Sequence, residues 1–192
     1  MLLTYVLNNT AHETYGEEVS HLDHALQAFA ASFDRELAGE GDAAAVAAFW
    51  HDIGHSAGHD VTVRMRGPSG EDLGALDHET RGAAMMSGII PPRFCTAIAL
   101  HTQAKRYMAG RSGQTLSAAS SATLQEQGGS MSLEEQLVFE GHSCMMEAMT
   151  LRVADDAGKD PNFDYSVWGG RAELLLLAIQ QTLRCALIIL DY

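Results

Sequence analysis

The sequence lacks most signs of secretion and of division into several domains. It has only three cysteines, Cys95, Cys144 and Cys185, which lie far apart and form no CxxC pair. No charged segment followed by an apolar signal segment stands at its start. We therefore expect a reduced, cytoplasmic protein. No long Pro-, Gly- or Ser-rich stretch interrupts the chain, so we expect residues 1–192 to form a single domain with its own core.

Basic residues are also scarce. Twelve Lys and Arg stand against 25 Asp and Glu, which gives a net charge of -13. Such a charge repels nucleic-acid phosphates and anionic lipids, so neither a nucleic acid nor a membrane is an expected partner. The apolar run from Leu174 to Leu190 is about the length of a short membrane span, but polar residues at 180–182 and 184 interrupt it. We expect a buried amphipathic helix there.

Apolar residues at helical spacing recur along most of the sequence. Apolar residues at three- and four-residue steps predict a helix over residues 18–37, and an alanine-rich helix capped by Asp42 is predicted over 42–53. Further helices are predicted over 77–87, 91–108, 132–154 with a break near Gly141, and 170–190. Residues 55–75 carry glycines, Pro68 and mixed charges, and are predicted to form a long loop. No run of strand-like alternation is present, so the predicted fold class is all-α.

A set of histidines and aspartates suggests a metal centre. In the segment FWHDIGH, the adjacent His51 and Asp52 end a predicted helix and could point into one cavity. A carboxylate can bridge two cations, and imidazole suits Fe, Zn, Mn or Ni. Further candidates lie on separate predicted helices, so that the full predicted ligand set is His24, His51, Asp52, His78, His101 and Asp155. The order H…HD…H…H…D is a specific signal for a metal centre.

This order of ligands resembles the HD-domain superfamily, in particular its mixed-valent di-iron oxygenases that degrade phosphonates. The segments HTQAKRYM, LSAASSATLQEQGGSMS and LRVADDAGK also resemble that group, and the likeness covers about residues 15–155. It implies an HD-domain helical bundle with a metal centre between the helices. It also implies that O2 is used to cleave the carbon–phosphorus bond of 1-hydroxy-2-(trimethylammonio)ethylphosphonate or 1-hydroxy-2-aminoethylphosphonate. The products would be phosphate and glycine betaine or glycine.

The resemblance further implies two iron ions (Fe2+/Fe3+), with Asp52 bridging them. His24, His51 and Asp155 would complete one site, and His78 and His101 the other. In the same way Tyr15 and Glu17 resemble a catalytic lid pair, in which the tyrosine occupies an iron position without substrate and the acid meets the substrate amine. Tyr15 lies one residue nearer the next ligand than the family pattern has it. Ser120 and Gln127 are implied as substrate-binding residues.

Residue type and spacing predict an anion pocket beside the metals. Lys105 follows His101 by four residues and Arg152 precedes Asp155 by three, so each would share a helix face with a ligand. His55, four residues after His51, could supply another donor. These side chains suit the oxygens of a phosphonate dianion.

The cationic end of the substrate is left open by the sequence. A primary ammonium is satisfied by a carboxylate such as Glu17, whereas a quaternary ammonium favours aromatic faces. Tyr15, Tyr165 and Trp168 are the candidate aromatics, although the last two more often represent core packing. The aromatic-rich segment NFDYSVWGG slightly favours the trimethylated substrate.

Two other functions use the same ligands. A metal-dependent HD phosphohydrolase would activate water instead of O2 and act on a nucleotide or phosphate ester. A metal-dependent sensor would bind a ligand without turnover. The remaining histidines, His12, His21, His59 and His142, are predicted to be surface or core residues. The sequence makes no prediction about the oligomeric state.

Overall fold

The computed structural model describes residues 12, 14, 18–39, 41–56, 63–112 and 117–190. Its helices are α2 (His21–Ser32), α3 (Ala43–Trp50), α4 (His78–Met86), α5 (Pro92–Ser112), α6 (Ala118–Glu126), α7 (Leu133–Glu140), α8 (Met145–Ala157) and α9 (Arg171–Leu190). Two short 3-10 helices, η1 (Ile53–Ser56) and η2 (Tyr165–Trp168), and two strands, β1 (Arg64–Arg66) and β2 (Asp72–Ala75), complete it. The predicted all-α class is confirmed.

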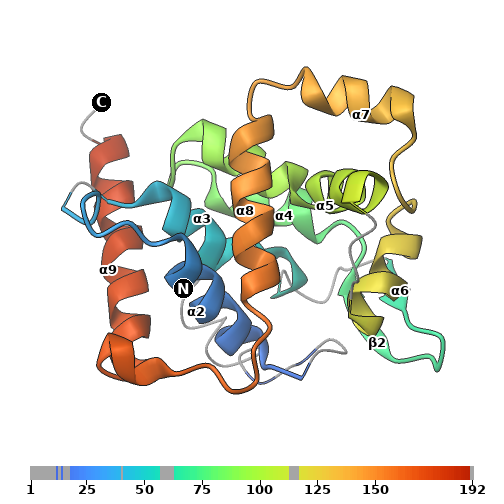
Figure 1. Ribbon diagram of the computed structural model, residues 1–192. Helices are drawn as coiled ribbons and strands as arrows, with labels where there is room; N and C mark the ends of the chain where they lie inside the picture. Colours follow the sequence, from blue (N-terminus) through green and yellow to red (C-terminus); the bar gives the residue numbers. More distant parts are fainter. Residues whose placement is uncertain are drawn as a thin grey trace.

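The main core forms where α2, α3, α5 and α8 pack together. In Figure 1, α8 crosses the middle of the molecule, with α3 on one side and α5 on the other, while α9 lies at the edge beyond α3. Fully buried side chains such as Leu26, Phe29 and Ile98 fill the space between these helices. Burial of this apolar surface fixes the helices relative to one another, and with them the polar residues that they carry.

Several predicted helix ends are confirmed by their capping contacts. The Asp42 side chain accepts a hydrogen bond from the backbone N–H of Ala45 at the start of α3. Ser132 and Glu135 form a capping box at the start of α7, where the helix over 132–154 was predicted to begin. The first helix is shorter than predicted, because Phe33 leaves the helix in an extended conformation and Leu37 lies exposed beyond it.

The prediction of a loop over residues 55–75 was wrong. This region contains η1 and an antiparallel hairpin, in which Arg64 pairs with Ala75 and Arg66 with Asp72. The strands have only three and four residues, and a bulge separates the two pairs. Strands this short cannot show the alternation by which a strand is recognised in sequence.

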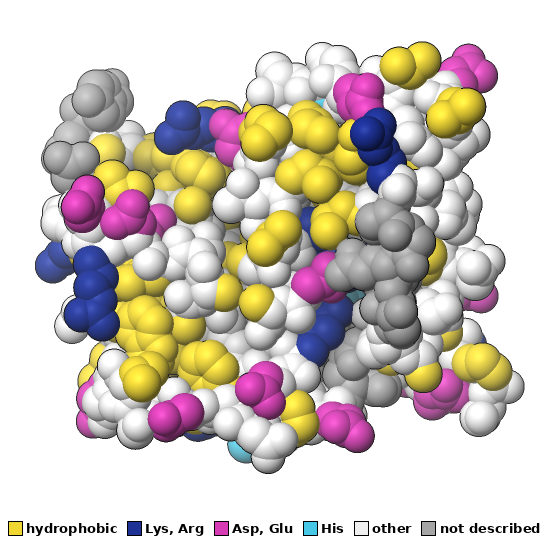
Figure 2. Space-filling view, viewed as in Figure 1, with side chains coloured by type: hydrophobic (Ala, Val, Ile, Leu, Met, Phe, Trp, Pro, Cys, Tyr) yellow, Lys and Arg dark blue, Asp and Glu magenta, His cyan; other side chains and the backbone are white. Residues whose placement is uncertain are grey.

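The closing helix α9 is buried on one face only. Leu174, Ala178 and Cys185 pack against the core, whereas Leu183 and Leu187 on the opposite face are about 60% exposed. Figure 2 shows hydrophobic side chains gathered over this part of the molecule. Within the described ranges, α9 is the one helix whose length and apolar composition would let it cross a membrane, which is weak evidence because core helices pass the same test.

Candidate metal centre

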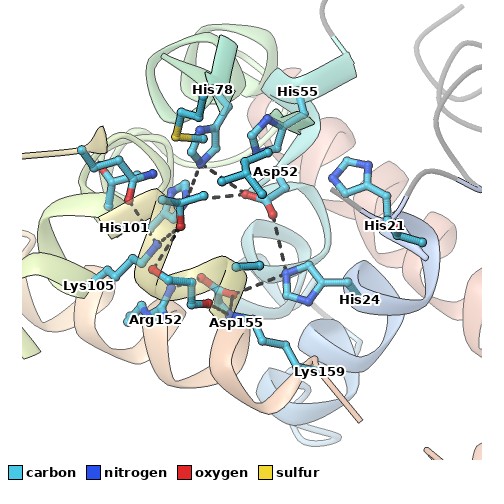
Figure 3. Close-up of a pocket in the computed structure, with 18 of the residues that line it drawn as sticks. His21, His24, Asp52, His55, His78, His101, Lys105, Arg152, Asp155 and Lys159 are labelled. Carbon is cyan, nitrogen blue, oxygen red and sulfur yellow. Dashed lines mark hydrogen bonds and ion pairs between the residues drawn. The ribbon is translucent and has the colours of Figure 1, made fainter. Parts of the chain in front are cut away.

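The six predicted ligands converge on one point of the helical bundle. His24 comes from α2, His51 and Asp52 follow α3, His78 begins α4, and His101 and Asp155 come from α5 and α8. Figure 3 shows the labelled members of this set pointing toward one another from these separate helices. Five of the six are buried, and Asp52 is only partly exposed. The arrangement therefore depends on the packing of the bundle as a whole.

One group of donor atoms surrounds the Oδ2 atom of Asp52. The Nε2 atoms of His24 and His51 lie 3.2 Å apart, and Oδ2 of Asp52 lies 3.6 and 3.3 Å from them, respectively. Asp155 completes the group, with its Oδ1 atom 3.4 Å from Nε2 of His24. Two nitrogens and two carboxylate oxygens thus face a common centre.

A second group surrounds the other oxygen of Asp52. The Nε2 atoms of His78 and His101 lie 3.1 Å apart, and each is 3.5 Å from Oδ1 of Asp52. The two oxygens of one carboxylate therefore face two different pairs of imidazoles. This is the geometry in which a carboxylate joins two cation sites.

The tautomers of the four histidines make all their Nε2 atoms acceptors. The Nδ1 atoms lie 2.7 to 2.9 Å from backbone carbonyl oxygens of Gly158, Ala48, Ala75 and Ile98. A carbonyl can only accept, so each Nδ1 carries a proton, and in the neutral ring that a metal ion requires each Nε2 presents a lone pair. Facing lone pairs repel unless a cation lies between them. Two donors that each lie about 2.1 Å from one ion are separated by roughly 3 to 4 Å, as here.

The local electrostatics also favour positive charge at this point. Burial would lower the pKa of His51, but Asp52 and Asp155 raise it to about 9. Burial would raise the pKa of Asp52, yet the surrounding histidines, His51 first, hold it well below its ordinary value. A set of imidazoles and ionised carboxylates fits a divalent or trivalent transition metal. The residues present therefore fit the metal centre that the sequence suggested.

His55 lies beside this centre but has the opposite tautomer. Its Nδ1 accepts a hydrogen bond of 2.9 Å from the backbone N–H of Ala75, and its ring stacks on His78 with 4.0 Å between the centroids. Burial, followed by His78, lowers the pKa of His55 well below its ordinary value, so the ring is neutral. Nε2 then carries the proton. Although His55, Asp52 and His78 lie close enough to form a three-residue metal group, this tautomer suits a hydrogen-bond donor better than a ligand.

Lys105 enters the cavity from the helix turn that follows His101. Its buried ammonium donates to Oγ1 of Thr123 and, at 3.2 Å, to Oε1 of Gln127. Burial, followed by Arg152, lowers the pKa of Lys105 to about 7. The structure thus brings Lys105 and Gln127 together at the cavity, as the sequence suggested for both.

The other predicted cation, Arg152, is held by carboxylates. Its Nη1 atom donates to Oδ2 of Asp155 at 2.6 Å, and its Nη2 atom donates to Asp156. Arg152 lines the cavity and also fixes the orientation of a predicted ligand. Ser120 is buried on α6, where its Oγ accepts a hydrogen bond of 2.9 Å from Nζ of Lys159. The helix cap is Ser117, whose Oγ accepts from the backbone N–H of Ser120.

Sequence reasoning missed several residues that line the cavity: His21, Thr102, Thr123 and Lys159. Lys159 follows Asp155 by four residues, the same spacing by which Lys105 follows His101, and its Nζ lies 3.6 Å from Oδ1 of Asp155. That spacing was the available signal. His21 was predicted to be a surface or core residue, but it lines the cavity near His55, with 6.0 Å between the ring centroids.

The cavity in front of the ligands has a volume of about 90 Å³. The suggested aromatic cage is not part of it within the described residues, because Tyr165 donates its hydroxyl to Asp23 and Trp168 packs edge-on against Phe33. The argument from these two aromatics for a trimethylated substrate is therefore not supported, and the identity of the substrate amine stays a prediction. The suggested lid residues, Tyr15 and Glu17, lie outside the described residues.

Comparisons with known proteins point to the same region of the chain. A family model described as HD domain matches residues 22–140. A [1-hydroxy-2-(trimethylamino)ethyl]phosphonate dioxygenase (glycine-betaine-forming) of Leisingera caerulea is 31% identical over 150 residues, which are 77% of this chain and 72% of that protein. A hydroxymethylphosphonate dioxygenase of Gimesia maris is 33% identical over 76% of this chain and 70% of its own length. An uncharacterised protein of Acanthamoeba polyphaga mimivirus is 32% identical over 75% and 64%, respectively.

Proposed function

This chain belongs to the HD-domain family, and from that premise we propose that it uses O2 and two iron ions to cleave the carbon–phosphorus bond of a 1-hydroxyphosphonate. It is an oxygenase of the HD-domain type, similar to two relatives named for the oxidation of phosphonates. The geometric observation that carries the proposal is the carboxylate of Asp52, whose two oxygens face two separate pairs of imidazoles.

The proposed ligand sets follow from these distances. His24, His51 and Asp155 would hold one iron with Asp52, and His78 and His101 would hold the other with the same Asp52. Four ligands at one site and three at the other would leave room for a substrate at the metals. His78, one of the residues assigned to the second site, stacks on the ring of His55, a neutral donor.

The reaction balances with one molecule of O2 for each phosphonate. The carbinol carbon loses its hydrogen and its bond to phosphorus and becomes a carboxylate, while phosphorus leaves as phosphate. One oxygen atom of O2 enters the carboxylate and the other enters the phosphate. The iron pair would supply electron transfer to O2 and acidify the bound substrate hydroxyl.

Positively charged side chains at the cavity would balance the negative charge of the phosphonate. Lys105 and Lys159 reach the same cavity from α5 and from the end of α8, and Ser120 connects α6 to Lys159. Two N–H groups of Lys105 bind Thr123 and Gln127, which orients its ammonium toward the cavity. His55 donates through Nε2. We propose that these donors, with Arg152 behind Asp155, hold the phosphonate oxygens beside the metals.

The proposal also specifies which amine group the substrate carries. We favour 1-hydroxy-2-(trimethylammonio)ethylphosphonate, with glycine betaine as product, because one relative is named for that reaction. The primary amine analogue, which would give glycine, is the alternative. We assign Glu17 to the cationic group and Tyr15 to a lid position, as the sequence resemblance implies.

Phosphate release and oxygen uptake test this function together. Iron-loaded protein is given 1-hydroxy-2-(trimethylammonio)ethylphosphonate, its primary amine analogue and hydroxymethylphosphonate, each with and without O2. We expect one phosphate for each O2 consumed and no phosphate in anaerobic solution. The substrate with the highest kcat/KM identifies the amine.

An isotope label separates the oxygenase from the phosphohydrolase that could use the same ligands. With 18O-labelled O2, the proposal requires label in both the phosphate and the carboxylate. Phosphate released without O2 from a nucleotide or another phosphate ester, with its new oxygen taken from water, would instead establish the hydrolase. Binding without turnover of any of these compounds would establish a sensor.

A further inference from the structure

A second cavity lies one helical turn from the metal centre. Its volume is about 230 Å³, and it lies between α2, α3, α5 and α8. Its inner wall includes Ala47, Ala97 and Leu151, which are all buried. No catalytic or binding role described so far uses this space.

The residues of the inner wall precede the proposed metal ligands by one helical turn in sequence. Ala47 precedes His51, Ala97 precedes His101, and Leu151 precedes Asp155, in each case by four residues. Residues four apart share a helix face and are separated by about 6 Å along the axis. Because α3, α5 and α8 contact one another, the three wall residues form a layer next to the layer of ligands.

The inner wall of the second cavity suits a small apolar molecule. The side chains of Ala47, Ala97 and Leu151 offer no hydrogen bond, so an ion or a polar substrate would lose its hydration there without compensation. The polar lining residues include Glu147, which would repel a phosphonate, and Thr150, which is exposed. The cavity opens to solvent beside Met146 and Thr150, but its buried apolar inner wall is the kind of surface that takes up apolar molecules such as xenon.

The first cavity is a poor route for O2 once the phosphonate is bound. It has less than half the volume of the second, and ionisable side chains such as Lys105, Arg152 and Lys159 line it. A phosphonate held by these groups would occupy the space in front of the ligands. A molecule of O2 that arrives after the substrate then needs another path to the metals.

We propose that the second cavity binds O2 and delivers it to the metal centre through the layer formed by Ala47, Ala97 and Leu151. The phosphonate and O2 would then approach the ligands through different spaces. This inference rests on the proposed oxygenase function, since a hydrolase would have no use for a gas path. Small side chains at positions 47 and 97 are its structural requirement, because larger ones would fill the cavity.

Xenon binding tests the cavity without any chemistry. Crystals of the iron-loaded protein are pressurised with xenon, whose anomalous scattering marks its position. We expect a xenon site in the second cavity of the wild type, and its loss in Ala97→Leu. Ala84→Leu, at an exposed position on α4 that lines neither cavity, is the matched control and should keep the site. An empty second cavity in the wild type overturns the proposal.

Steady-state kinetics test delivery to the metals. In Ala97→Leu the kcat/KM for O2 should fall several-fold, while the kcat/KM for the phosphonate at saturating O2 stays unchanged. Because a buried substitution can impair folding, Thr150→Trp provides a second test at an exposed position of the lining. If both variants fold and keep the wild-type kcat/KM for O2, the path is refuted. Xenon binding by a protein that consumes no O2 would instead refute the oxygenase function, and with it the role of the cavity.

Discussion

At the residue scale, Asp52 differs from the other proposed ligands because its two carboxylate oxygens face two different pairs of imidazoles. Its Oδ2 atom lies 3.3 Å from Nε2 of His51, and its Oδ1 atom lies 3.5 Å from Nε2 of His78. The remaining ligands each face one group only. Loss of this one side chain should therefore affect both halves of the centre.

Replacement of the bridging carboxylate should remove both metals. In Asp52→Ala, each group of imidazoles loses its shared oxygen ligand, and we expect the iron content to fall from two per chain to nearly zero, with all turnover lost. Metal analysis of the purified protein measures this. Asp164→Ala is a suitable control, because Asp164 is an exposed residue that caps η2 and lines neither cavity. An Asp52→Ala protein that retains two irons would refute the bridging assignment.

The charge of Lys105 should make anion binding depend on pH. Burial and Arg152 lower its pKa to about 7, so the ammonium of the free protein is lost as pH rises through that value. Sulfate, which stays a dianion over this range, is the appropriate probe. We expect its affinity as an inhibitor to fall above about pH 7 in the wild type.

The variant Lys105→Arg isolates that contribution, since arginine stays protonated. Both proteins share the same metal centre, so the difference between their pH profiles reports on Lys105. The fall in sulfate affinity should be smaller in the variant. Identical pH profiles in the two proteins would show that loss of the Lys105 proton does not weaken sulfate binding.

At the scale of elements, a glycine lets the end of α8 approach α2. A Cβ atom on Gly158 would lie 2.8 Å from Nδ1 of His24 and 2.9 Å from its backbone oxygen. The carbonyl of Gly158 also accepts the hydrogen bond from Nδ1 that fixes the tautomer of His24. This close contact therefore sets the orientation of one ligand.

Gly158→Ala should weaken one metal site and spare the other. The added methyl group must displace the His24 ring, at a cost of about 1–3 kcal/mol for overpacking. We expect the iron content to fall from two toward one per chain. Gly39→Ala, where a Cβ meets nothing within 4 Å, is the control and should keep both irons. Full occupancy in Gly158→Ala would show that the ring adapts without loss of the ligand.

Several elements could be predicted from sequence for physical reasons. Helices with capping residues and apolar periodicity, such as α3 and α7, were recognised from local signals. The segment that forms α6, AASSATLQE, buries only Ser120 and Leu124, so it has no apolar stripe to detect. The hairpin strands β1 and β2 are too short to show alternation.

The candidate site was predictable to a similar degree. The six candidate ligands were found because they are histidines and aspartates, the adjacent His51 and Asp52 at the end of one predicted helix and the other four on separate elements. The cavity residues Thr102 and Thr123 have no such signal, because threonine is common on any surface. The contacts of Arg152 with Asp155 and Asp156 depend on side-chain conformation, which spacing alone does not define.

At the scale of the whole molecule, the proposed metal centre would join helices that are distant in sequence. Its proposed ligands extend from residue 24 to residue 155, so bound ions would crosslink most of the bundle. The HD-domain match covers residues 22–140, and the prediction that residues 1–192 form one domain remains a prediction. Metal binding and folding should accordingly be coupled.

Removal of metal should lower the thermal stability of the protein. A ligand at a hundred times its Kd stabilises by about 2.7 kcal/mol, which in a chain of this size raises Tm by roughly 5–10 °C. We expect the chelated protein to unfold at a correspondingly lower temperature and to recover when ferrous iron is restored. Differential scanning calorimetry measures this. A Tm that is insensitive to iron would contradict a centre built from five parts of the chain.

The most direct test of the account is Mössbauer and EPR spectroscopy of the iron-loaded protein, combined with its iron content. The geometry around Asp52 predicts two irons per chain whose spins are magnetically coupled through the shared carboxylate and any further bridge. One iron per chain, or two irons without coupling, would contradict a bridged pair and the proposed function that depends on it.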